Sequence, residues 1–277
     1  MPAPGRALRP DNDAGTWPAH LRYDRNAMDS SERIDLPAYL ARIEWTGATR
    51  PTFETLAGLL HAHMRHIPFE NLDVLLGKGI DIGLGAVQRK LVHAHRGGYC
   101  FEHGTLLAAA LEALGFAPMR HAARVVLVAP RTDVPRTHMF LTVALAEGRF
   151  VLDPGFGSLA PQIPLPLDAA EGPDAGAASH WMARDDDYWV LRARKEGEIV
   201  DCWASTLEAE NASDFVVANH YVATHPASAF RNRLLLRALT ENIARYEAAF
   251  GEITMPSNSS LAENLFRPPH PPEPPKE

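Results

Sequence analysis

The strongest chemical signal in the chain is the segment Arg-Gly-Gly-Tyr-Cys-Phe-Glu at residues 96–102. It directly precedes a buried-type apolar stretch with helical spacing, so we expect Cys100 at or near the first residue of a helix. Unpaired N–H groups and the helix dipole favour an anion there, which would make Cys100 a nucleophilic thiolate at neutral pH. From this segment alone, a buried structural cysteine is an equally good interpretation.

A catalytic thiolate also needs a base and a group that orients the base, and His138 and Asp153 can supply them. If Ala144 pairs with Arg149 in a hairpin, His138 and Asp153 become diagonal neighbours on one face of the strands. A hairpin closed by residues 147–148 would instead leave His138 about 13 Å away along the strand. A Cys-His-Asp triad therefore predicts the first register, whereas two unrelated surface residues would fit either.

The composition is that of an ordinary globular protein, because 46% of the 277 residues are hydrophobic and 22% are charged. A net charge of −7 gives no electrostatic reason to expect nucleic acid or a membrane as partner. Cys100 and Cys202 cannot build a disulfide framework or a cysteine-rich zinc site, so we expect a cytoplasmic protein. The first 27 residues lack the apolar block of a signal peptide.

Periodicity changes along the chain predict an α+β protein. The predicted parts are a polar, poorly ordered leader (1–29), a helical bundle carrying Cys100 (30–115), a β region carrying His138 and Asp153 (116–218), a smaller α/β unit (219–266) and a proline-rich tail (267–277). Thr52 should cap one helix that Pro68 ends, and Gly115 should end the buried helix after Cys100. Strands are expected at 124–129, 138–145, 149–153, 188–194, 199–205 and 234–239, a loop at 168–178 and a helix at 241–250.

Several segments, in this order, resemble the arylamine N-acetyltransferase family. They are IPFENLDVLLG (67–77), RGGYCFE (96–102), THMFL (137–141), LDPGFG (152–157) and NHYVATHP (219–226). The resemblance implies a helical bundle, a central β-barrel and a C-terminal α/β lid around a transglutaminase- or papain-like Cys-His-Asp core. It spans most of residues 35–250.

The resemblance also implies a role for each matching residue. Cys100 would be the acetylated nucleophile, His138 its base and Asp153 the group that orients His138, while Glu70 and Arg96 would form a structural ion pair. The acceptor pocket would be lined by Phe69, Val126 and Phe156, and coenzyme A would lie near Gly155, Gly157, Ser228 and Phe230. The chain departs from the family pattern at Gly104, where Asn is expected, and at Pro154, where a small β-branched residue is common.

The reaction implied is ping-pong transfer of an acetyl group from acetyl-CoA, through a Cys100 thioester, to the nitrogen of a small arylamine or arylhydrazine. Acetyl-CoA is then a co-substrate, no permanently bound cofactor or metal is expected, and a role in xenobiotic metabolism is implied. A macrolactam-forming amide synthase and a transglutaminase-like cysteine hydrolase remain alternatives. A papain-like hydrolase fits less well, because it places its histidine roughly 130 to 150 residues after the cysteine.

A metal site is the alternative from another class of protein. His61, His63 and His66, with His93 and His95 nearby, form the histidine-rich part of the chain. Only His63 and His66 have the spacing to share one helix face, and no carboxylate lies between residues 61 and 66. We therefore predict no metal.

Overall fold

The computed structural model describes residues 33–167 and 179–238. The expected leader, the loop at 168–178, the helix at 241–250 and the proline-rich tail lie outside these residues. Within the two described ranges, no helix has the length and apolar character needed to span a bilayer.

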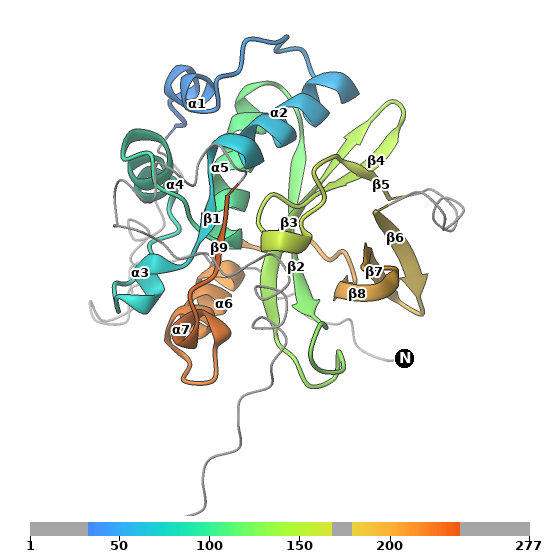
Figure 1. Cartoon of the computed structure of the whole chain (residues 1–277). Coiled ribbons are helices and arrows are strands. Elements are labelled where there is room, and N and C mark those ends of the chain that lie inside the picture. The colour runs from blue at the N-terminus through green and yellow to red at the C-terminus, as the bar shows by residue number, and fades with distance from the viewer. Residues whose placement is uncertain (1–32, 168–178, 239–277) are drawn as a thin grey trace, which may run out of the picture.

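The first part of the chain is helical, as predicted (Figure 1). Thr52 caps α2 by accepting a hydrogen bond from Thr55 N at 3.3 Å, and Gly115 follows α5 with a φ of +85°, so both predicted helix boundaries are confirmed. The elements are α1 (Leu36–Arg42), α2 (Phe53–His66), β1 (Phe69–Glu70), α3 (Leu72–Leu75), α4 (Leu84–Val87), a π-helical turn η3 (Gln88–His93) and α5 (Cys100–Ala113).

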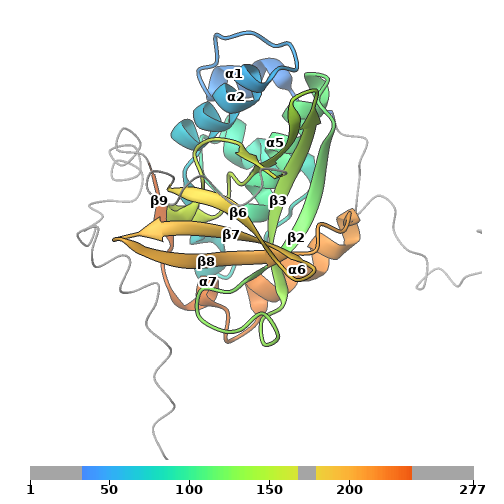
Figure 2. The same ribbon diagram turned by 90° about the vertical axis from the view of Figure 1, so that its right-hand side faces the viewer.

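The middle part is one antiparallel sheet in the order β5-β4-β3-β2-β8-β7-β6. Its edge strands β5 and β6 contact each other, so the sheet is a nearly closed barrel, and Figure 2 shows β7 and β8 crossing β2 and β3 steeply. The strands are β2 (Pro118–Val125), β3 (Arg136–Leu145), β4 (Gly148–Leu152), β5 (Leu165–Pro166), β6 (His180–Asp185), β7 (Tyr188–Lys195) and β8 (Glu198–Ser205).

The predicted hairpin register is confirmed, because Ala144 pairs with Arg149. The hairpin of β7 and β8 is confirmed as well. The strand expected at 124–129 is wrong over most of its length: β2 ends at Val125, and its earlier residues are held in the sheet by pairing with β3 from Pro118 onward. Strand β6 was not predicted, since its residues show neither an apolar run nor a clean alternation.

The last described part returns to the helical bundle. It contains α6 (Ala212–Thr224), α7 (Ala229–Asn232) and β9 (Leu236–Arg237), and β9 pairs with β1. Figure 1 shows α6 and α7 beside this two-stranded ladder. Because α6 begins at Ala212, the predicted domain boundary at residue 218 falls inside a helix, and the strand expected at 234–239 is only two residues long.

Helix α5 is the structural centre of the protein. Its apolar residues pack into the bundle core on one side, while Cys100 and Phe101 belong to a separate cluster with Phe215 of α6. A third cluster, which includes Phe140 and Trp203, fills the barrel. The start of α5 thus lies where bundle, barrel and C-terminal part meet, and burial on all sides fixes its direction.

Candidate active site

Cys100 is the first residue of α5 and is only 3% exposed. The helix start is held by Glu102, whose carboxylate accepts a hydrogen bond from Tyr99 N at 3.1 Å and pairs with Lys90 Nζ at 2.8 Å. A Cβ atom on Gly98 would lie 2.5 Å from Glu102 Oε2, so a glycine is required there. Cys100 therefore sits where the sequence predicts, at the positive end of a buried helix.

His138 and Asp153 form the predicted contact: His138 Nε2 lies 2.8 Å from Asp153 Oδ2. Two further donors hold the carboxylate, namely Trp203 Nε1 at 2.8 Å from Oδ2 and Gly155 N at 3.2 Å from Oδ1. Asp153 is completely buried and His138 is 3% exposed. Buried carboxylates are stable in the charged form only when hydrogen bonds replace water, and these three donors supply them.

The contact with Asp153 fixes which nitrogen of His138 is free. Since Nε2 faces the carboxylate, Nδ1 is the nitrogen available to Cys100. Burial alone would lower the pKa of His138, but the charge of Asp153 and the hydrogen bonds to Asp153 and Cys100 raise this pKa to about 10. His138 is therefore protonated at neutral pH and stabilises an anion beside it.

The turn after Asp153 brings the parts of the site together. A Cβ atom on Gly155 would lie 2.5 Å from Cys100 Cα, so only glycine allows the turn to approach the cysteine this closely. The Phe156 ring lies 4.9 Å from the His138 ring, centroid to centroid. Gly157 adopts a φ of +65° and would place a Cβ atom 3.6 Å from the Phe69 ring.

Of the residues expected around the acceptor, Phe69 and Phe156 lie at this turn. Val126 follows β2, is half-buried and donates its N–H to Cys202 O at 3.1 Å; no described contact joins it to the two phenylalanines. Phe230, expected near coenzyme A, lies 6.3 Å from Phe69, ring to ring.

Of the other residues expected near coenzyme A, Gly155 and Gly157 belong to the turn, whereas Ser228 has a local structural role. Its hydroxyl donates to Val222 O at 2.6 Å and accepts from Phe230 N at 3.3 Å, which caps α7.

The predicted ion pair is also present: Arg96 Nη2 lies 2.9 Å from the buried Glu70 Oε1.

Three buried residues, His103, His63 and Tyr39, support this arrangement from the bundle. Of these the sequence indicated only His63, and only as a candidate metal ligand. His103 Nε2 lies 3.2 Å from Pro68 O and must donate to it, so His103 Nδ1 accepts from His63 Nε2 at 2.8 Å. His63 Nδ1 then accepts from the Tyr39 hydroxyl at 3.0 Å. Burial lowers the pKa of His103 to about 4, so the chain of hydrogen bonds is neutral and holds the residue before Phe69.

The two departures from the family pattern are both accommodated. A Cβ atom on Gly104 would lie 2.5 Å from Met139 Sδ, so Met139 fills the space that a larger residue would need. Pro154 is buried in the turn between Asp153 and Gly155.

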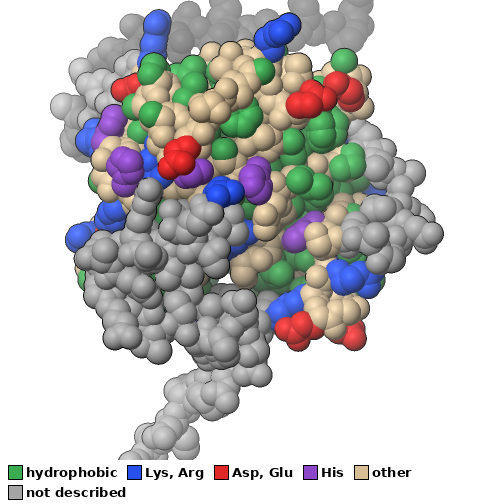
Figure 3. Space-filling view, turned by 45° about the horizontal axis from the view of Figure 1, so that its top comes forward, with side chains coloured by type: hydrophobic (Ala, Val, Ile, Leu, Met, Phe, Trp, Pro, Cys, Tyr) green, Lys and Arg blue, Asp and Glu red, His purple; other side chains and the backbone are tan. Residues whose placement is uncertain are grey.

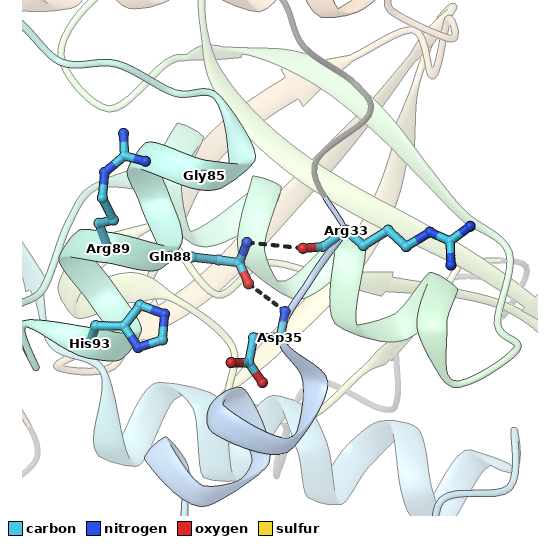
Figure 4. Close-up of a pocket in the computed structure, with 6 residues that line it drawn as sticks. All are labelled: Arg33, Asp35, Gly85, Gln88, Arg89 and His93. Carbon is cyan, nitrogen blue, oxygen red and sulfur yellow. Dashed lines mark hydrogen bonds between the residues drawn. The ribbon is translucent and has the colours of Figure 1, made fainter.

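Two hollows on the described surface have a volume of about 280 Å³ each, and neither is lined by Cys100, His138 or Asp153. Figure 4 shows the first of them, where the guanidinium groups of Arg33 and Arg89 point away from each other. On the face in Figure 3, acidic and basic side chains are interspersed among hydrophobic ones. In the described ranges, no group of three metal-ligating side chains forms a metal site.

Fold and site together define a mixed α/β protein with a nearly closed barrel and with Cys100, His138 and Asp153 gathered beside a helix start. A family model described as N-acetyltransferase matches residues 52–257. The arylamine N-acetyltransferase of Mycolicibacterium smegmatis is 39% identical over 77% of this chain and 79% of its own length. That of Escherichia coli is 36% identical over 72% of this chain and 70% of its own.

Solved structures agree with these relatives. The arylamine N-acetyltransferase of M. tuberculosis matches with a TM-score of 0.70 and 38% identity over 75% of this chain and 79% of its own. The Mycobacterium marinum enzyme in complex with CoA matches with a TM-score of 0.70 and 34% identity over 75% and 78%. The chain therefore belongs to the arylamine N-acetyltransferase family and is an acetyltransferase.

Proposed function

We propose that the protein transfers an acetyl group from acetyl-CoA to the nitrogen of an arylamine or arylhydrazine through a thioester on Cys100. One observation carries the proposal: His138 is held by the buried Asp153 and is hydrogen-bonded to a cysteine at the start of a buried helix. A histidine beside a cysteine at such a position can take the thiol proton, which makes the sulfur a nucleophile. The relative solved in complex with CoA supports the choice of acetyl donor.

In the first half-reaction, the Cys100 thiolate attacks the thioester carbonyl of acetyl-CoA. Backbone N–H groups at the start of α5 are suited to stabilise the oxyanion that forms. Collapse of the tetrahedral intermediate breaks the bond to the coenzyme A sulfur, which takes the proton from His138. The products are coenzyme A and acetyl-Cys100, with His138 left neutral.

In the second half-reaction, the amine attacks acetyl-Cys100 and His138 removes the proton that the nitrogen loses as the amide forms. Cys100 leaves as a thiolate, and the starting ion pair is restored. Aromatic amines and hydrazines suit this step, because their nitrogens are uncharged at neutral pH. We propose that Phe69, Phe156 and Val126 contact the acceptor.

For the donor, we propose that coenzyme A passes near Gly155, Gly157, Ser228 and Phe230. The two glycines support this because they let the backbone of the turn approach Cys100 and Phe69 without a side chain. Phe230 adds an apolar wall, since its ring lies 5.5 Å from that of Tyr99.

Initial-rate kinetics with varied acetyl-CoA and a varied arylamine test the proposal. A ping-pong reaction gives parallel lines in double-reciprocal plots. Intersecting lines would show direct transfer without an acetyl-enzyme. Hydrolysis of acyl donors without amine acetylation would favour the transglutaminase-like alternative, and failure to use any CoA thioester would favour a macrolactam-forming amide synthase.

A further inference from the structure

Arg237 is a cationic residue beside the site that the proposed reaction does not use. It lies on β9 and is the cross-strand partner of Phe69 on β1, so the two side chains share one face of the ladder. The other residue of β1, Glu70, belongs to the opposite face and is bound by Arg96. Strand β9 also lies against η4 (Gly157–Leu159), which continues the turn after Asp153.

Among the described residues, none forms a hydrogen bond or ion pair with the guanidinium of Arg237, although the residue is half-buried. Burial lowers its pKa, and its charge acts on Asp153, His103 and His180. Asp153 cannot serve as its partner, since His138, Trp203 and Gly155 already donate to that carboxylate. Five N–H donors of a half-buried cation are thus left for a ligand.

An arginine with free donors recognises carboxylates and phosphates, which accept two parallel hydrogen bonds from its planar fork. Its position favours the carboxylate of the acceptor over a phosphate of coenzyme A. Arg237 lies beside Phe69 and within electrostatic reach of Asp153, whereas the pantetheine arm separates the phosphates of acetyl-CoA from its thioester. An aromatic ring against Phe69 and Phe156 would bring a ring carboxylate to this arginine.

We propose that Arg237 determines acceptor specificity by binding the carboxylate of acidic arylamines, of which aminobenzoates are the simplest. This inference rests on the proposed function of the same site. In the free protein the β1–β9 ladder fixes the backbone of Arg237, so only its side chain has to be ordered when the carboxylate binds.

The test compares 4-aminobenzoate with its neutral counterpart 4-aminobenzamide in the full-length enzyme and in Arg237→Gln. We expect the ratio of kcat/KM for the acid to that for the amide to fall by about tenfold to a hundredfold in Arg237→Gln, the size of one hydrogen bond between charged groups. Arg237→Lys should recover part of the ratio. Arg192→Gln, which removes an arginine bound to Asp201 on the barrel, should leave it unchanged.

An equal loss with both acceptors would overturn the proposal and give Arg237 a structural role only. A higher KM for acetyl-CoA with an unchanged ratio would also overturn it and identify a phosphate as the ligand. Equilibrium binding of both compounds to Cys100→Ala needs no catalysis: preferential binding of 4-aminobenzoate that Arg237→Gln removes would support the proposal even if acetyl transfer failed. Equal binding of acid and amide would contradict it.

Discussion

Replacing Asp153 by Asn tests the electrostatics of the site most sharply. In the folded protein the pKa of His138 is raised from 6.5 to about 10. At about 1.4 kcal/mol per pKa unit, the surroundings favour protonated His138 by about 5 kcal/mol. Asp153 is the main opposing influence to burial, so the Asn variant loses most of this preference and leaves Trp203 and Gly155 facing a neutral amide.

The sign of the effect on stability follows from the raised pKa. A group that binds its proton more tightly when folded stabilises the protein fully below its unfolded pKa, near 6.5, and loses that contribution as the pH rises toward about 10. Linkage then gives a wild-type advantage over Asp153→Asn that is about 3 kcal/mol larger at pH 6 than at pH 9. Urea unfolding at both pH values measures it.

The matched control is Asp201→Asn, because Asp201 is a more exposed aspartate that is bound to Arg192 on the barrel. Its effect on the unfolding free energy should differ by less than about 0.5 kcal/mol between the two pH values. Turnover should fall by about 10⁴-fold in Asp153→Asn, the size of the same change in a serine-based triad. A pH-independent loss of stability, or near-normal turnover, would refute the reasoning.

Burial raises the pKa of Cys202 to about 12, so limited alkylation at pH 7 should label Cys100 alone; equal labelling by intact mass would contradict this. Trp203→Phe removes a donor to buried Asp153, so it should lower the free energy of unfolding by about 1.5 to 3 kcal/mol in urea and should also lower kcat. An unchanged kcat would contradict a role for Trp203 in positioning Asp153. Asn71→Ala removes three hydrogen bonds to residues 230, 233 and 235, so it should raise the KM for acetyl-CoA more than it lowers kcat, and an unchanged KM would contradict this.

The central part of the site was predictable because it depends on short-range sequence patterns. A glycine-rich turn before an apolar helix indicated the position of Cys100. Two hairpin registers fitted the sequence, and the one that a Cys-His-Asp triad requires is the one present. The helix boundaries at Thr52 and Gly115 followed from capping preferences in the same way.

The surrounding residues were not predictable, because distant segments bring them together. Trp203 reaches Asp153 from a strand 50 residues later, and Asn71 binds backbone atoms more than 150 residues away. Arg237 meets Phe69 only through the β1–β9 pairing, which involves two residues on each strand and leaves no periodic signal. The length of β2 likewise depends on its neighbours β3 and β8, so the apolar residues after Val125 were misleading.

The most direct test of the account is the intact mass of the full-length protein after incubation with acetyl-CoA and no acceptor. Wild type and Cys202→Ala should each gain one acetyl group, and peptide mapping should place it on Cys100. An arylamine added afterwards should remove that group and appear as the acetylated amine. Cys100→Ala should gain nothing, and an acetyl group that still attached to it would contradict the proposed mechanism.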